Sequence, residues 1–115
     1  MEEIEVLGQT SFREEHRAFG IKPNDRRHHI YILGKTGTGK STLIKNMVIQ
    51  DMRLNHGVAL IDPHGDLVED LLNFVPKTRT NEVVYFNPAD NENPVAINIL
   101  EAKGDDEKHL VASSL

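Results

Sequence analysis

The chain has 115 residues, of which 38% are hydrophobic and 27% are charged, and its formal net charge is −5 with histidine neutral. This length corresponds to one small domain or to part of one. The acidic balance argues against a chain that wraps nucleic acid by itself, because neutralising phosphates requires clustered lysine and arginine. The absence of cysteine excludes a disulfide framework and a thiolate metal site. With no signal peptide and no apolar run of ~18–20 residues, we expect a cytoplasmic location, with membrane association left open for the full-length protein.

The first 25 residues predict a short β-rich lead-in. Ile4–Leu7 is typical of a strand, and Thr10–Arg13 could form a second one. Phe19–Ile21 is a third apolar stretch, and Pro23–Asp25 then reads as a turn. We therefore expect residues 1–25 to form a lead-in and residues 26–115 to form the main domain.

The residues from Gly34 to Thr42 fit the pattern G-x-x-x-x-G-K-[ST] of a phosphate-binding loop, the Walker A motif. Glycines let the backbone curl so that successive N–H groups point at a phosphate. Lys40 is expected to place a cation on the β- and γ-phosphates, and Ser41 to ligate a Mg²⁺ ion that bridges them. The predicted nucleotide-binding residues are Gly34, Lys35, Thr36, Gly37, Thr38, Gly39, Lys40, Ser41 and Thr42.

The surroundings of this loop decide between a phosphate site and a glycine-rich turn that binds nothing. The run 28–33 before the loop is rich in β-branched and aromatic residues, which predicts a strand. Residues 39–54 predict a helix, with Gly57 as its left-handed C-terminal stop. Strand, glycine loop and helix in this order favour the phosphate site. The apolar face of the predicted helix carries Leu43, Ile44, Met47, Val48 and Met52.

The rest of the chain predicts further elements of an α/β domain. Residues 58–62 and 82–86 suggest strands buried on both faces, as in a parallel sheet flanked by helices. Between them, Asp66 is the expected N-cap of a helix that stops before Pro76. We also expect an extended segment at 95–100 and a helix from residue 105 onward. So few parallel strands would leave a sheet edge exposed, so we expect an incomplete domain, the N-terminal part of a larger ATPase.

Asp62 has two interpretations at the end of its predicted strand. Strand ends in a parallel sheet line the ligand crevice. The Asp62 carboxylate could therefore assist catalysis, or it could bind Mg²⁺ directly or lie in the second coordination sphere of the ion. Alternatively, Asp62 fixes the Pro63-His64-Gly65 turn, and we favour this structural role. His64 could sense the γ-phosphate, but most exposed turn histidines have no such task.

The chain resembles the HerA/FtsK superfamily of DNA- and protein-pumping ATPases. Within that group it is most similar to type IV secretion or conjugation coupling proteins and their TraD-like relatives. The resemblance implies a RecA-like P-loop core, usually hexameric, that uses ATP and Mg²⁺ and threads DNA through a central channel. The family's later Asp-Glu pair has no counterpart here, which puts independent turnover in doubt. The supporting motifs are Phe19-Gly20-Ile21-Lys22, Arg26-Arg27-His28-His29, the loop from Gly34 to Thr42, Asp62-Pro63-His64-Gly65-Asp66, Tyr85-Phe86-Asn87-Pro88 and Pro94-Val95-Ala96-Ile97-Asn98.

Three functions remain open from the sequence. The first is the ATP-binding part of a DNA-translocating motor. The second is a small-molecule kinase or other phosphotransferase that uses Asp62 directly, although no lid-like arginine cluster follows the loop. The third is a non-catalytic module in which the nucleotide has a structural role.

Overall fold

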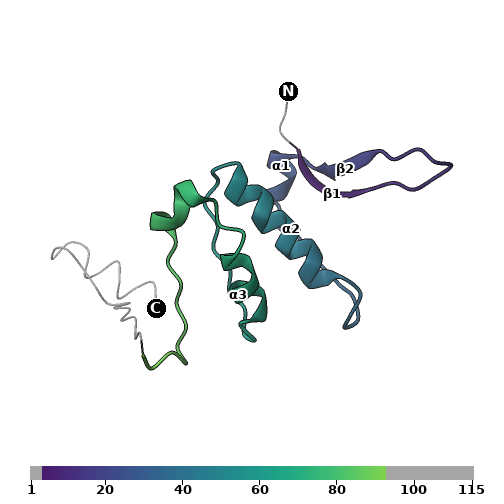
Figure 1. The fold of residues 1–115 in the computed structure, drawn as a ribbon. Coiled ribbons are helices and arrows are strands. Elements are labelled where there is room, and N and C mark those ends of the chain that lie inside the picture. The colour runs from purple at the N-terminus through teal and green to yellow at the C-terminus, as the bar shows by residue number, and fades with distance from the viewer. Residues whose placement is uncertain (1–3, 93–115) are drawn as a thin grey trace, which may run out of the picture. The chain divides into compact units, whose positions relative to one another are not determined.

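The computed structural model describes residues 4–92, and the predictions for 95–100 and for the helix from residue 105 lie outside this range. Within residues 4–92 no helix is long and apolar enough to cross a lipid bilayer. The chain divides into two units, Met1–Val83 and Val84–Leu115, and every named element lies in the first. These elements are β1 (Glu5–Gln9), β2 (Ala18–Ile21), α1 (Pro23–Arg26), α2 (Lys40–Arg53), α3 (Asp66–Leu72) and the 3₁₀-helix η1 (Lys77–Glu82), shown in Figure 1.

Strands β1 and β2 form an antiparallel hairpin, in which Glu5 pairs with Ile21 and Gln9 with Ala18. A β-carbon added to Gly20 would lie 2.0 Å from the carbonyl oxygen of Glu5, so only glycine allows the two strands to approach this closely. The strand predicted at Ile4–Leu7 is thus confirmed, and the apolar stretch Phe19–Ile21 lies within β2. The strand predicted at Thr10–Arg13 is wrong, because this segment belongs to the hairpin loop, where Arg13 adopts a positive φ of 51°.

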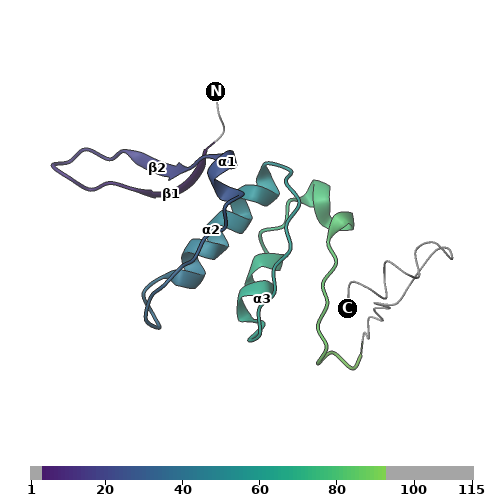
Figure 2. The same cartoon turned by 180° about the vertical axis from the view of Figure 1, so that it is seen from behind.

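Helix α2 confirms the helix predicted over residues 39–54, but it ends differently. Leu54 is its C-cap, and the left-handed residue that follows is Asn55, with φ of 62°. The predicted stop at Gly57 is wrong because asparagine tolerates this conformation and already turns the chain two residues earlier. Near this end of α2, the Gln50 side chain binds the edge of β1, accepting from Val6 N–H and donating to Val6 C=O at 2.8 Å each. The hairpin therefore lies at the opposite end of α2 from the glycine loop (Figure 2).

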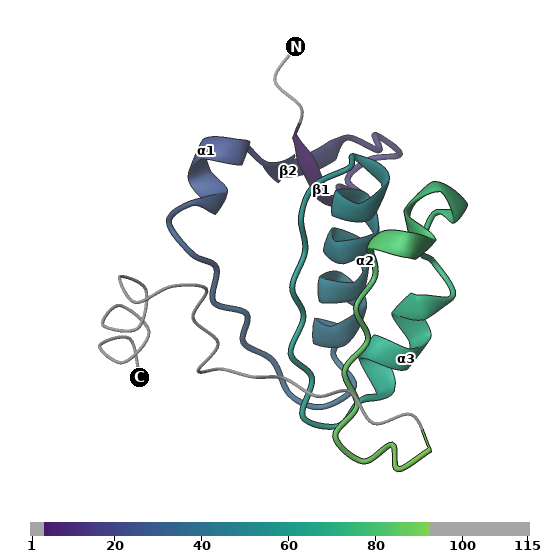
Figure 3. The same ribbon diagram turned by 90° about the vertical axis from the view of Figure 1, so that its left-hand side faces the viewer.

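The buried side chains of the first unit gather around α2. Met47 and Ile49 on α2 and Leu71 on α3 are the buried apolar residues within 4–92. Helices α2 and α3 lie side by side, as Figure 3 shows. Asp51 on α2 is also buried, and its charge is compensated by two 2.7 Å hydrogen bonds that it accepts from Arg26 of α1. The end of α2 is thereby joined to both the hairpin and α1.

The strands predicted at 28–33, 58–62 and 82–86 are not formed in the structure. A strand needs a hydrogen-bonded neighbour, and among residues 4–92 the hairpin alone forms a sheet. The apolar side chains of these segments are accordingly exposed, with Tyr31 at 85%, Leu33 at 78% and Ile61 at 93%. In addition, η1 extends into the third segment as far as Glu82. The parallel sheet expected from the sequence therefore stays a prediction.

Candidate nucleotide-phosphate site

The loop from Gly34 to Lys40 has the backbone that a phosphate-binding loop requires. Gly37 and Gly39 have φ of 81° and 93°, a region that strains residues with a side chain. Gly34 is required for a different reason, because an added β-carbon would lie 2.5 Å from Thr38 Oγ1. Three glycines predicted from the motif are thus explained by two separate constraints, conformation and close packing.

Lys40 is held against this loop by two hydrogen bonds. Its Nζ donates to the carbonyl oxygen of Gly34 at 2.6 Å and to that of Lys35 at 2.9 Å. The Thr38 hydroxyl also donates to the Lys35 carbonyl, at 2.6 Å. The ammonium group therefore lies across the curve of the loop, at the start of α2. A cation, glycine N–H groups and a helix N-terminus are together suited to an anion of the phosphate type.

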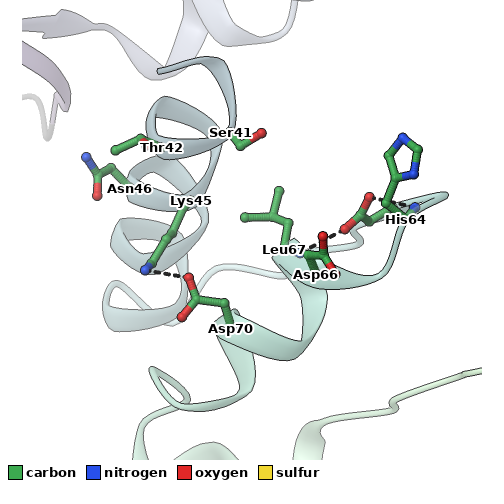
Figure 4. Close-up of a pocket in the computed structure, with 9 residues that line it drawn as sticks. Ser41, Thr42, Lys45, Asn46, His64, Asp66, Leu67 and Asp70 are labelled. Atoms are coloured by element: carbon green, nitrogen blue, oxygen red, sulfur yellow. Dashed lines mark hydrogen bonds and ion pairs between the residues drawn. The ribbon is translucent and has the colours of Figure 1, made fainter. Parts of the chain in front are cut away.

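A pocket of about 430 Å³ opens beside the loop, between α2 and α3. Ser41 lines it from the first turn of α2, and Asp62 and His64 line it from the segment before α3. Figure 4 shows Ser41 near one end of this pocket and the Lys45–Asp70 pair near the other. The structure thus brings together Ser41, Asp62 and His64, which the sequence had suggested separately. The lining residues are Ser41, Thr42, Lys45, Asn46, Asp62, His64, Asp66, Leu67 and Asp70.

The Asp62 carboxylate closes the turn that leads into α3. Its Oδ1 accepts the backbone N–H of His64 at 3.1 Å, and its Oδ2 accepts the N–H of Leu67 at 2.9 Å. Partial burial would raise the pKa of Asp62, but these N–H groups stabilise the carboxylate and the pKa is lowered overall. These are the contacts that the structural interpretation of Asp62 predicts, and a role toward Mg²⁺ stays a prediction.

The helix after this turn begins differently from the prediction. The N-cap is Gly65, with φ of 87°, and Asp66 is the first helical residue and makes no capping hydrogen bond. The N-cap prediction for Asp66 is therefore wrong. The reason is that Asp62, four residues earlier, reaches over the left-handed glycine and accepts the N–H that an N-cap side chain would otherwise take.

Lys45 and Asp70 are pocket residues that the sequence did not single out. Lys45 Nζ lies 2.6 Å from Asp70 Oδ2 and 4.4 Å from the centre of the Phe74 ring. The signal for Lys45 was its spacing, because a residue four positions after Ser41 lies on the same helix face. Asp70 had no signal of this kind, since its partner lies on another helix.

The donor set fits a nucleotide whose metal is held largely by phosphate. Within the described residues 4–92 no three histidine, cysteine, aspartate or glutamate side chains form a group that could hold a metal ion by themselves. Mg²⁺ usually keeps water and phosphate ligands and takes one or two from the protein. The Ser41 hydroxyl, one residue after Lys40 at the start of α2, fits that requirement.

These features define a P-loop protein: a glycine loop with left-handed residues, a lysine bound to its carbonyls, and a helix that begins at that lysine. The family model described as "Helicase HerA, central domain" matches residues 9–113, so the chain belongs to that family. The family consists of ATPase motors of the HerA/FtsK kind, which use ATP and Mg²⁺ in general. Searches of curated proteins and of solved structures give no match.

Proposed function

We propose that the chain binds ATP·Mg²⁺ through Gly34–Thr42 and that, in the full-length protein, this site drives DNA translocation. The observation that carries the proposal is Lys40, whose ammonium lies 2.6 Å from the Gly34 carbonyl and 2.9 Å from that of Lys35. Hydrogen bonds from an ammonium to carbonyls keep the cation at the loop without neutralising it, so its charge remains available to phosphate.

Each part of the loop has a distinct task in this proposal. ATP supplies a transferable γ-phosphoryl group, and hydrolysis of that group releases the energy for movement. Lys40 neutralises charge on the phosphates, while Gly37 and Gly39 allow backbone N–H groups to face them. Ser41 supplies a hydroxyl ligand for Mg²⁺. No apolar run followed by Asp-Glu occurs in the 115 residues, so we assign hydrolysis to the full-length protein.

A RecA-like parallel sheet is part of the proposal. It is supported by the exposure of Tyr31, Leu33 and Ile61 on unpaired segments that flank the two helices, because a sheet would bury such side chains. We further propose that the full-length protein acts as a hexamer and resembles type IV secretion or conjugation coupling proteins. The Asp62–Asp66 motif supports this narrower assignment, and the match over residues 9–113 supports the broader HerA/FtsK class.

Titration of the chain with a fluorescent ATP analogue and Mg²⁺ tests the binding step. Lys40→Ala removes the cation at the loop and should weaken binding by at least tenfold, since a hydrogen bond to a charged group is worth about 1.5–3 kcal/mol. Lys77→Ala is the matched control, because Lys77 is an exposed lysine on η1 outside the pocket. Equal binding by wild type and Lys40→Ala would rule out the site assignment.

A steady-state ATPase assay, with and without single-stranded DNA, separates the remaining alternatives. Nucleotide binding without turnover by this chain is expected if hydrolysis needs the full-length protein. If the full-length protein also fails to hydrolyse ATP, the non-catalytic module is the correct function. Transfer of phosphate to a small acceptor would instead establish the phosphotransferase.

A further inference from the structure

The structure assigns a role to the turn before α3: we propose that His64 contacts the γ-phosphate side of the bound nucleotide, and that Asp62 is the positioning residue that holds it there. This inference rests on the proposed function, because it requires ATP·Mg²⁺ at Gly34–Thr42. It differs from a Mg²⁺-binding role for Asp62, which would place that carboxylate itself on the metal.

The position of the pocket carries the first step. The Mg²⁺ held by a P-loop serine bridges the β- and γ-phosphates, so the space beside that serine adjoins the end of the triphosphate. Here this space is the pocket between α2 and α3, and Ser41 and His64 both line it. An ATP γ-phosphate at Ser41 would therefore face this pocket, whereas ADP would leave this part of it to water.

The charges in the pocket carry the second step. Lys45 and His64 are the lining side chains that can carry a positive charge. Lys45 is already paired with Asp70, 2.6 Å away. The His64 ring makes no hydrogen bond within the described part of the chain, so both ring nitrogens are available to a ligand. The pocket is otherwise lined by hydroxyl, amide, carboxylate and apolar side chains, so the His64 ring is the basic group of the pocket with free nitrogens that an added phosphate can engage.

The hydrogen bonds of Asp62 carry the third step. One carboxylate oxygen holds the N–H of His64 and the other holds the N–H of Leu67, so a single side chain fixes the turn on both sides of Gly65. Both oxygens are committed to the backbone, and the lowered pKa of Asp62 keeps the carboxylate ionised and accepting. Removing the carboxylate frees the backbone that carries the His64 ring.

The test compares affinity for ATP·Mg²⁺ with affinity for ADP·Mg²⁺. His64→Ala should lower affinity for ATP·Mg²⁺ about tenfold, the effect of one hydrogen bond to a charged group, and leave affinity for ADP·Mg²⁺ within about twofold. His64→Gln keeps a side-chain donor and should retain most of the preference for ATP. His16→Ala, in the exposed hairpin loop, is the matched control and should leave both affinities unchanged.

Asp62→Ala distinguishes positioning from metal binding. If Asp62 acts through His64, this variant shows the same selective loss, and the double variant with His64→Ala is no weaker than His64→Ala alone. Glu69→Ala, an exposed acidic residue on α3 outside the pocket, is the control and should bind like wild type. The positioning role would be overturned if the two substitutions lowered affinity additively in the double variant and the loss extended to ADP·Mg²⁺. That result would favour a direct role of Asp62 at Mg²⁺.

The outcomes separate this inference from the function on which it rests. Loss of all binding in Lys40→Ala, together with an unchanged ATP preference in His64→Ala, would refute the role of His64 alone. Binding that Lys40→Ala does not affect would refute the proposed function itself. Circular dichroism melts of every variant show whether a loss of affinity comes from unfolding.

Discussion

Replacing Asp51 should destabilise the chain at pH 7, whereas replacing Glu5 should leave its stability unchanged or raise it, although both carboxylates are buried beside Arg26. Asp51 accepts two hydrogen bonds of 2.7 Å from the guanidinium group, and a third contact comes from His56 Nδ1 at 3.1 Å. Glu5 Oε2 lies 2.5 Å from Arg26 Nη1, within ion-pair distance, yet both Glu5 oxygens are buried without a hydrogen bond in bonding geometry.

The pKa shifts of the two carboxyl groups agree with this difference. The hydrogen bonds from Arg26 lower the pKa of Asp51 below the ordinary value of an aspartate carboxyl group. Burial, and then the nearby charge of Asp51, raise the pKa of Glu5 above the ordinary value of a glutamate carboxyl group. A lowered carboxyl pKa means that ionisation stabilises the fold, and a raised one means that ionisation destabilises it. At pH 7 the Asp51 charge is therefore favourable and the Glu5 charge is unfavourable.

The magnitudes follow from the cost of breaking a buried ion pair. Removing one partner typically costs about 3–5 kcal/mol. Because the Arg26 side chain is 30% exposed and can still interact with Glu5, we expect Asp51→Asn to cost about 2–3 kcal/mol, below that range. Glu5→Gln removes a buried charge that lacks hydrogen bonds, so it should be neutral or stabilise the fold by up to about 1 kcal/mol at pH 7.

Urea denaturation between pH 4 and pH 8, followed by circular dichroism, measures both effects. As pH falls from 7, wild type should gain stability while Glu5 becomes protonated, and the advantage of Glu5→Gln should disappear as the pH approaches 4.5. Below pH 4, outside the window of this titration, wild type should lose stability as Asp51 becomes protonated, because the pKa of Asp51 is lowered in the folded chain. Equal destabilisation by Glu5→Gln and Asp51→Asn at pH 7 would refute this account of the cluster.

Two further substitutions test the loop and the packing of α3. Gly39→Ala places a β-carbon at φ of 93°, which should lower the free energy of unfolding by about 1–2 kcal/mol in thermal or urea denaturation. The same variant should bind the fluorescent ATP analogue more weakly. An unchanged affinity would show that the left-handed backbone at Gly39 is not needed for nucleotide binding. Leu71→Ala should lower the free energy of unfolding by about 2–5 kcal/mol, because Leu71 is 5% exposed. Leu72→Ala is the matched control and should lower it by less than about 1 kcal/mol, because Leu72 is 38% exposed. Equal costs for the two leucines would contradict the packing of α3 against α2.

The sequence predicted the parts of the protein that depend on local interactions. Helix α2 follows from the apolar spacing of residues 43–52, and the loop follows from a motif whose glycines each meet a local constraint. The family was also predictable, because the motifs that carry the resemblance lie within the matched range 9–113. All these features are encoded within short segments, so neighbouring residues suffice to predict them.

Features that join distant segments were decided by the tertiary structure. The strands predicted at 28–33 and 58–62 did not form, because apolar β-branched residues favour a strand but cannot supply its hydrogen-bonded neighbour. Of the two interpretations of Asp62, the backbone contacts match the structural one, because its carboxylate accepts the N–H groups of His64 and Leu67. The pairing of Lys45 with Asp70, 25 positions away, required the packing of two helices. Local pattern thus determined where the phosphate loop lies, whereas packing between α2 and α3 determined which side chains share its pocket.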